Sequence, residues 1–373
     1  MTTHRTLGRA NPDRRELASC VLALAREAAT AHAMATSEVT ACASHFAPSQ
    51  LPLQWDDHFS MRICNGQELE RALAHARGKG EDNAAVEAFL TELQEQPVER
   101  ALSQPPLVEA LAHLADHFPN FSEVVDFILR RTALALLDPT SPLSLPPIVL
   151  DGPPGVGKTA FASALAYALD VPILSLQMAH ATGPFDLAGL DPKFSNGGPG
   201  LLVRTVALGK AVDPLVLLDE LDKVPKDRNH DPIGPLYSLL EPSTAKRFID
   251  DGIKLPMNMS HVRWICTTND VRHLHPAIAS RCQVFQISAP TLEQGRVIAC
   301  NVYATMLKDH AWGRHFAPSL SEDVADLLAR DTPRELTRAL ENALGLAALE
   351  QRPVLLITDF AETKPPARGP GFL

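Results

Sequence analysis

Residues 146–170 read PPIVLDGPPGVGKTAFASALAYALD, and the fold of the whole chain follows from this stretch. An apolar run at residues 148–150 has the length of one buried parallel strand. A loop rich in glycine and proline follows at once. Beyond the loop, apolar residues recur every four positions from Phe161 to Leu169 and form one helical face. The stretch therefore predicts a strand, a loop and a helix in direct succession.

The loop has the composition of a phosphate-binding P-loop. Gly155 and Gly157 carry no side chain, so backbone N–H groups can approach a polyphosphate there. Because prolines 153 and 154 have no N–H, the donors must come from Gly155 onward and from the positive end of the following helix. The residues expected to surround the nucleotide are Gly152, Pro153, Pro154, Gly155, Val156, Gly157, Lys158 and Thr159.

Lys158 and Thr159 begin the predicted helix and supply the two side chains that a P-loop needs. We expect the Lys158 ammonium to reach the β- and γ-phosphates of ATP and the Thr159 hydroxyl to bind Mg²⁺. The alternative is a glycine turn that matches the pattern by chance, and the flanking strand and helix argue against it. ATP and Mg²⁺ are therefore the expected ligands.

Two further predicted strands end in polar residues. Residues 215–218 form an apolar run that is followed by Asp219 and Glu220. Such a run belongs in a central parallel strand, whose carboxyl end faces the ligand crevice. We expect Asp219 to hold Mg²⁺ through its water shell and Glu220 to act as the general base on the attacking water. A strand at residues 262–268 places Asn269 at the same edge, where its side chain can bridge the water and the γ-phosphate.

Two arginines lie at the ends of predicted helices. Arg281 ends a short predicted helix that begins at His275. Arg334 lies in the first turn of a later helix, for which Thr332 is the N-cap and Glu335 completes a capping box. An arginine at the positive end of a helix is mildly unfavourable, so a nearby anion would account for it.

Composition limits the classes of partner. The 373 residues are 45% hydrophobic, which suffices for two or three domains with a sizeable core, and their net charge is −10. This acidic balance disfavours nucleic acid as a partner. No apolar run approaches the ~18 residues of a membrane span, and residues 1–20 lack the apolar core of a signal peptide. We therefore expect a cytoplasmic protein without a membrane partner. The cysteines and histidines form neither C-x-x-C nor H-E-x-x-H, so no disulfide framework or zinc site is indicated.

Together these motifs resemble the AAA+ ATPases and, among them, the ATPase module of the Lon protease family. The resemblance rests on VLDGPPGVGKT, on LVLLDELDKV, on DPIGPLYSLLEP at residues 231–242, on the spacing from Asn269 to Arg281 and on the closing ITDF. It covers roughly residues 115–365. The resemblance implies that Lys158 and Thr159 are Walker A residues, Asp219 and Glu220 Walker B, Asn269 sensor 1, Arg281 the arginine finger and Arg334 sensor 2. It also implies a homo-oligomeric ring, expected to be a hexamer.

The segment GPFDLAGLDPKFSNGGPG, at residues 183–200, contains one conspicuous aromatic, Phe194. Its glycine-rich second half is a poor core element, so it is either a flexible surface loop or a working one. The family resemblance places Phe194 where the aromatic of the substrate-gripping pore loop lies. Ser195 and Asn196 depart from the family's aliphatic residue and glycine, so a second interpretation stays open, in which Phe194 anchors the loop on its own domain.

Three regions follow from these assignments. Residues 1–105 are predicted to be a helical N-terminal region, either a small appendage or a recruitment domain, without clear likeness to the family's β-rich substrate-binding domain. Residues 106–290 form the nucleotide-binding domain, in which Phe118 and Phe121 either sandwich an adenine or belong to the core. Residues 291–373 form a helical lid and a tail, with a short strand predicted at residues 354–357.

The predicted fold is therefore an α/β P-loop NTPase of the AAA+ type, with a parallel sheet flanked by helices, a C-terminal helical lid and a helical N-terminal region. We expect an ATP hydrolase that remodels or unfolds a protein partner. The chain stops at Leu373, about where the family's Ser-Lys peptidase domain would begin, so no proteolytic activity is expected. A nucleotide-gated switch or assembly factor is the first alternative, and a DNA-directed AAA+ machine, disfavoured by the charge, is the second.

Overall fold

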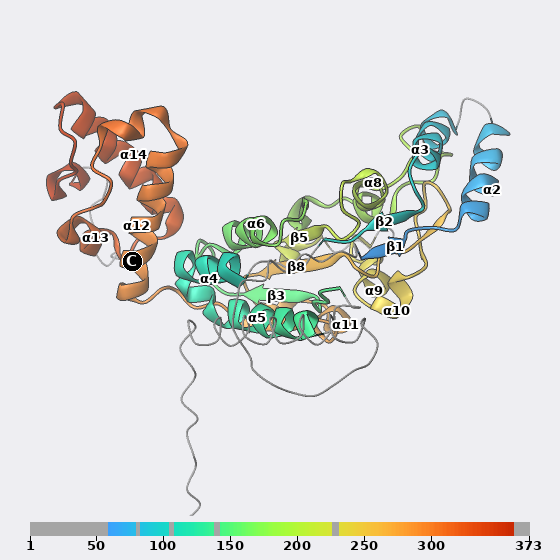
Figure 1. Cartoon of the computed structure of the whole chain (residues 1–373), viewed down its shortest axis with the longest axis horizontal. Helices are drawn as coiled ribbons and strands as arrows, with labels where there is room; N and C mark the ends of the chain where they lie inside the picture. The colour runs from blue at the N-terminus through green and yellow to red at the C-terminus, as the bar shows by residue number, and fades with distance from the viewer. Residues whose placement is uncertain (1–58, 80–82, 104–107, 138–141, 226–230, 362–373) are drawn as a thin grey trace, which may run out of the picture.

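The computed structural model describes residues 59–79, 83–103, 108–137, 142–225 and 231–361 (Figure 1). The helices predicted before residue 59 and the tail after residue 361 lie outside these ranges. Within the described part of the chain, no helix is both long and apolar enough to cross a membrane.

A five-stranded parallel sheet forms the centre of the molecule, with the strand order β4-β5-β8-β3-β9. Strands β3, β5 and β8 are buried along their whole length, as expected for apolar strands of a parallel sheet that is covered on both faces. The predicted parallel α/β sheet is confirmed. Its strands are β3 (Ile148–Asp151), β4 (Ile173–Gln177), β5 (Leu215–Asp219), β8 (Arg263–Thr268) and β9 (Gln283–Gln286).

Side chains alternate along the strands between two hydrophobic cores. Ile148 and Leu150 of β3 pack in a core with residues of α4, α5 and α6. Val149, between them, packs in the other core with residues of α8 and α9. The helices around the sheet are α4 (Val108–His117), α5 (Ser122–Leu137), α6 (Lys158–Ala168), α7 (Phe185–Ala188), α8 (Leu201–Leu208), α9 (Leu236–Leu239), α10 (Pro242–Ala245) and α11 (Pro276–Ala279).

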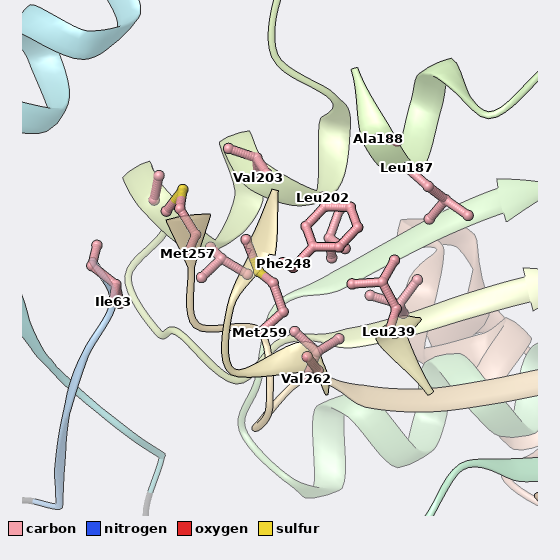
Figure 2. Packing of buried hydrophobic residues seen from close by; sticks show 14 of the residues in the cluster. Ile63, Leu187, Ala188, Leu202, Val203, Leu239, Phe248, Met257, Met259 and Val262 are labelled. Atoms are coloured by element: carbon pink, nitrogen blue, oxygen red, sulfur yellow. The ribbon is translucent and has the colours of Figure 1, made fainter. Parts of the chain in front are cut away.

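The described part of the N-terminal region shares the second core. Helices α2 (Gly66–Arg77) and α3 (Ala84–Gln94) lie between the two strands of an antiparallel pair that the sequence did not predict, β1 (Ser60–Arg62) and β2 (Glu99–Ala101). Figure 2 shows Ile63 in the same cluster as Met257, Phe248 and Leu202. Cys64 also forms a β-bridge with Met257, which precedes the sheet strand β8 and belongs to the small pair β6 (Phe248–Ile249) and β7 (Pro256–Met257).

A buried ion pair joins this region to the sheet. Arg263, the first residue of β8, lies 2.8 Å from the carboxylate of Asp213, and both side chains are buried. Ser103 donates to the same carboxylate from its backbone N–H at 3.1 Å and from its hydroxyl at 2.7 Å. Because a buried charge left without its partner is strongly destabilising, these contacts fix where β2 meets the α/β domain.

The C-terminal helices have a core of their own. Ile298, Tyr303 and Leu340 are among its buried residues, and the helices are α12 (Leu292–Asp309), α13 (Glu322–Leu328) and α14 (Pro333–Leu349). In Figure 1 they form a separate body at the end opposite α2 and α3.

The prediction of a strand at residues 354–357 is wrong. Those residues form no strand, and a 3₁₀ helix begins at Ile357. Asp359 closes the segment on itself, because its carboxylate accepts the backbone N–H of Leu356 at 2.8 Å and pairs with Arg352 at 2.8 Å. An apolar run needs a neighbouring strand to become part of a sheet, and none lies beside this segment among the described residues.

Candidate functional site

The P-loop connects β3 to α6 through two glycines with positive φ. Gly155 has φ 84° and Gly157 has φ 101°, conformations that strain any residue with a Cβ atom. Gly157 is the residue before α6, so the loop leads directly into the N-terminus of that helix. The predicted order of strand, glycine loop and helix is therefore present, and the backbone N–H groups at the start of α6 are available to an anion.

Lys158 is the first residue of α6, and its side chain is buried against the loop. Its Nζ donates to the carbonyl oxygens of Gly152 at 2.6 Å and Pro153 at 2.9 Å, and to Oδ1 of Asn269 at 3.3 Å. Burial lowers the pKa of Lys158, whereas nearby carboxylates, first that of Asp151, raise it. The structure thus brings Lys158 and Asn269 together, although they are far apart in the sequence.

Asp219, at the end of β5, is the centre of a hydrogen-bond network. The Thr159 hydroxyl lies 3.2 Å from both of its carboxylate oxygens. Thr267 donates to Oδ1 at 2.5 Å, and Gln177 donates to Oδ2 at 2.9 Å. Gln177 and Thr267 were not predicted as site residues, although Gln177 is the last residue of β4 and Thr267 the second last of β8, and a polar residue near the end of a strand is the signal that could have found them.

Glu220 turns sharply away from the strand. Its backbone is left-handed, with φ 56° and ψ 47°, and its N–H donates to the Thr267 hydroxyl at 2.9 Å. Such a conformation costs on the order of 1–3 kcal/mol in a residue other than glycine. The Glu220 carboxylate is partly exposed and forms an ion pair with Lys223, whose pKa is raised by that hydrogen bond. Any role as a base requires Glu220 to leave Lys223.

Asp151 is a site residue that the sequence prediction missed. It ends β3 immediately before the P-loop and is buried. Its carboxylate accepts the Thr268 hydroxyl at 2.7 Å, the Val271 N–H at 2.9 Å and the Gln286 amide at 2.8 Å. Asp151 thereby ties together β3, β9 and the turn that carries Asn269. A charged residue at the end of an apolar strand was the available signal.

The carboxylates at this edge suit a hard cation. Four carboxylates lie near enough to raise the pKa of Lys158: those of Asp151, Asp219, Glu220 and Asp222. Oδ1 of Asp222 is buried without a hydrogen-bond partner in the described structure. No group of three or more His, Cys, Asp and Glu residues forms a ready metal site within the described ranges. Mg²⁺ is typically bound by one or two carboxylates together with substrate phosphates rather than by an all-protein cage. The hydroxyl of Thr159 and the carboxylate of Asp219 fit that mode.

Arg281 is not part of its own chain's phosphate site. It follows α11, where its Nη1 donates to the carbonyl oxygen of Ala277 at 2.7 Å. Its Nε lies 3.7 Å from a carboxylate oxygen of Glu241. Neither contact involves the P-loop, and Arg281 forms no hydrogen bond or ion pair with Lys158 or Asp219 in the described structure.

Arg334, by contrast, lies at the P-loop side of α14. Its neighbours Thr332 and Pro333 pack on the loop, at 3.4 Å and 4.0 Å from where a Cβ of Gly155 and of Gly157 would be. The predicted capping box of Thr332 is present. Arg334 is exposed and forms no ion pair among the described residues.

The two phenylalanines before the P-loop have different surroundings. Phe121 is fully buried and stacks on Phe161, with ring centroids 4.4 Å apart. The core interpretation is therefore confirmed for Phe121. Phe118 is partly buried and lines an apolar groove of about 810 Å³ between α4, α6 and α12, which begins at Val156 and Gly157.

Phe194 is presented to solvent by a closed loop. Leu190 and Gly198 form an antiparallel bridge, with N–H to O distances of 2.9 and 2.8 Å. At the tip, the Phe194 N–H donates to the Asp191 carbonyl at 3.0 Å, and the Phe194 side chain is 61% exposed. Phe194 is therefore not packed as an anchor on its own domain.

Asp250 holds the base of this loop. Its fully buried carboxylate accepts the backbone N–H groups of Gly200 at 2.9 Å, Gly252 at 2.8 Å and Ile253 at 3.1 Å. It also lies against Gly189, where a Cβ would be 2.4 Å from Oδ1. Burial raises the pKa of Asp250 to about 6, against the opposing effect of the three N–H donors.

This raised pKa predicts a pH dependence of stability. Because the folded value, about 6, exceeds the ordinary value of 3.8, Asp250 contributes stability that is present below pH 3.8 and is lost as the pH rises through about 6. Asp250→Asn removes this titration. The difference in the free energy of unfolding between the variant and the unmodified chain should therefore change by up to about 3 kcal/mol between pH 4 and 7 and stay constant above pH 7. Urea unfolding across this range measures the difference, and parallel curves would contradict the assignment. Asp251→Asn, at an exposed neighbour, is the control.

Comparison with known proteins agrees with this geometry. Residues 148–289 match the family described as ATPase family associated with various cellular activities (AAA). A Lon protease of Ureaplasma parvum is 26% identical over 291 residues, which cover 74% of this chain and 36% of that protein. Lon protease homolog, mitochondrial, of Drosophila melanogaster is 31% identical over 231 residues, covering 61% and 22%.

The chain spans about a third of the length of the first curated relatives that it matches. Among solved structures, the Thermotoga maritima RuvB Holliday junction branch migration motor has a TM-score of 0.41 and 15% identity, covering 68% of this chain and 67% of that one. Residues 148–289 match the AAA family model, and the predicted resemblance of this region to Lon proteases is confirmed.

Proposed function

We propose that this chain hydrolyses ATP and uses the hydrolysis to remodel or unfold a protein partner. One observation carries the proposal: β3, β5 and β8 end side by side, and their ends bring Lys158, Asp219, Glu220 and Asn269 to one edge of the sheet. The relatives that the chain resembles are named Lon proteases. For this chain we propose only the ATP-driven remodelling and no proteolysis.

The chemistry follows from the contacts. The N–H groups from Gly155 to the start of α6 would receive the phosphates, and Lys158 would exchange its bonds to loop carbonyls for bonds to the β- and γ-phosphates. The substrate is Mg·ATP, whose metal Thr159 and Asp219 would hold. Glu220 would accept a proton from a water oriented by Asn269. That oxygen bonds to the γ-phosphorus as the bond to the ADP oxygen breaks.

The apolar groove beside the P-loop supports a nucleotide as the ligand. It begins at Val156 and Gly157, one wall carries Phe118, and another carries Pro333 of α14. A base attached to phosphates in the loop would have this groove within reach, and an apolar wall with few polar groups is typical of such sites. The base would thereby touch both the α/β domain and α14.

The positions of the two arginines support a ring. Since Arg281 lies away from its own P-loop, we propose that it acts on the nucleotide of a neighbouring subunit, in a ring expected to be a hexamer. Arg334, next to Thr332 and Pro333 on the loop, would instead contact the nucleotide of its own chain.

A specific observation favours one alternative, a nucleotide-gated switch or assembly factor. Glu220 is held by Lys223, and a base that is engaged in an ion pair slows hydrolysis. A switch needs ATP binding to set a state and tolerates slow turnover, whereas a remodelling motor needs turnover that responds to its substrate. The two functions therefore differ in how ATP hydrolysis depends on an unfolded protein.

Phe194→Ala separates these functions. The exposed ring can contact a polypeptide of any sequence through its apolar face, so its loss should abolish the stimulation of ATP hydrolysis by an unfolded protein. Basal hydrolysis should stay near normal, because an exposed substitution changes stability by only about 0.5 kcal/mol. Phosphate release with and without a permanently unfolded, carboxymethylated protein measures both quantities.

Two controls accompany this experiment. Phe194→Tyr keeps an aromatic ring and should keep the stimulation. Leu349→Ala removes an apolar side chain that is 83% exposed at the end of α14, outside the nucleotide groove, and should not change the stimulation. If Phe194→Ala is still fully stimulated, Phe194 does not grip the substrate and the switch is the better account.

A further inference from the structure

A second groove, of about 570 Å³, lies between helix α2 and the loop that carries Phe194. Its floor is apolar and buried, and includes Ala76, Val86, Ile253 and Leu255. Helices α2 and α3, which contribute to its lining, lie at the end of the molecule remote from the C-terminal helices (Figure 1). The groove is therefore separate from the proposed nucleotide site.

Basic side chains line both walls of this groove. On α2 and just beyond it, Arg71, His75 and Lys79 recur every four residues and are exposed on one face. On the opposite wall lie Lys193, next to Phe194, and Lys254. This concentration of positive charge stands out in a chain whose net charge is −10.

The two acids among the described residues that line the groove, Glu68 and Asp191, are already engaged. Glu68 pairs with Arg247 at 3.2 Å. The Asp191 carboxylate accepts the backbone N–H of Lys193 at 3.0 Å, and this bond and the nearby charges of Lys193, Lys254 and Lys79 lower its pKa. Among its described lining residues, the groove therefore has more basic than acidic side chains.

The cations, by contrast, are largely available. Arg71, Lys79 and Lys193 form no ion pair with any acid in the described part of the chain. Lys254 pairs with exposed Asp251 at 2.6 Å. The Lys254 backbone has φ 52°, a conformation that strains a residue with a Cβ and that glycine would adopt without cost. Strained residues of this kind concentrate at binding sites.

We propose that this groove binds an acidic segment of an unfolded polypeptide and delivers it to Phe194. The proposal rests on the remodelling function and names its substrate class. Carboxylates of the segment would meet the cations of both walls, and apolar side chains between them would lie on the floor of Ala76, Val86 and Leu255. Because Lys193 directly precedes Phe194, a segment held on that wall is next to the exposed ring.

A nucleic acid is a poorer match for the same groove. Among the described residues its lining contains no Phe, Tyr or Trp on which bases could stack, and two carboxylates, Glu68 and Asp191, would face the phosphates. The acidic balance of the chain would also repel a long polyanion. An acidic polypeptide carries a lower charge density and can place apolar residues on the floor.

The test compares charge-reversed full-length chains. Arg71→Glu with Lys79→Glu should weaken the binding of a fluorescent, unstructured peptide of Asp, Glu and Leu about tenfold. Lys210→Glu with Lys308→Glu makes the same change in net charge at exposed positions outside the groove and should change affinity less than about twofold. Basal ATP hydrolysis should be unaffected in both. Arg71→Gln with Lys79→Gln, which introduces no repulsion, should give an intermediate loss.

Binding is measured by fluorescence anisotropy. The competitors are a peptide in which Asn and Gln replace the Asp and Glu residues, and a single-stranded oligonucleotide. Equal affinity for the acidic and amide peptides would overturn the proposal, as would tighter binding of the oligonucleotide or an equal loss in the control pair. If the acidic peptide binds as expected but never stimulates ATP hydrolysis in the unmodified chain, the groove assignment stands and the remodelling function fails.

Discussion

Glu220→Gln is expected to abolish ATP hydrolysis while ATP binding persists. The amide keeps the shape of the side chain but cannot accept a proton, and a positioned general base contributes about 10²- to 10⁴-fold to a rate. Glu220 directly follows β5, is partly exposed and can turn toward a water, whereas Asp219 is buried among Thr159, Thr267 and Gln177. Phosphate release measures the rate, and a fluorescent ATP analogue measures the affinity.

Two companion variants make this result specific. Lys158→Ala should lose nucleotide binding itself, because it removes the cation that the loop carries. Lys223→Ala frees Glu220 from its ion pair and should leave hydrolysis intact or faster. Hydrolysis by Glu220→Gln at the unmodified rate would show that another residue is the base. In the expected case, the same variant would retain ATP-bound complexes, and a pull-down with it would identify the protein partner.

Arg281→Ala should reduce kcat by about 10³- to 10⁵-fold, the usual worth of an arginine finger, which corresponds to about 4–7 kcal/mol of transition-state stabilisation. The loss should occur although Arg281 touches no residue of its own P-loop, because the residue would act on the neighbouring subunit. Arg272→Ala is the matched control: this arginine lies nearby in the sequence, its side chain is 84% exposed, and it pairs with Asp270. Thermal unfolding checks that both variants fold.

Mixing subunits tests the same point without relying on a single substitution. An Arg281→Ala subunit still binds ATP, and a Lys158→Ala subunit still offers its arginine. Mixed assemblies should therefore recover part of the activity that neither variant has alone. Full activity in a strictly monomeric preparation would refute the ring and return Arg281 to the role that its contacts with Ala277 and Glu241 describe.

Local sequence was sufficient for the central sheet and for most of the phosphate site. The apolar runs before Gly152 and Glu220 could only be buried strands, and Gly155 and Gly157 are needed where φ is positive. Parallel strands end at the same edge, so the proximity of Lys158 and Asn269 could be predicted before it was observed. These features depend on residues close in sequence or on a rule of sheet topology.

Local sequence failed where a partner from elsewhere decides the conformation. The apolar run at residues 354–357 has strand propensity, but no strand lies beside it within the described structure, and Asp359 folds it into a turn. The reverse holds for β1 and β2, which pair across more than thirty residues and have little pattern of their own. β-structure is a property of pairs, so a single segment specifies it weakly.

The sequence by itself determined which chemistry the chain carries: a P-loop, an acidic pair, and a polar residue after the neighbouring strand. Only the tertiary structure decided what surrounds them. Asp151 ties three segments around Asn269, Asp250 closes the base of the Phe194 loop, and α2 lies opposite Lys193 to form the basic groove. The physical reason is the same in each case. A charged side chain acquires its partners from segments distant in the chain, so the effects of burial and of neighbouring charges on its charged form arise only once those segments pack together.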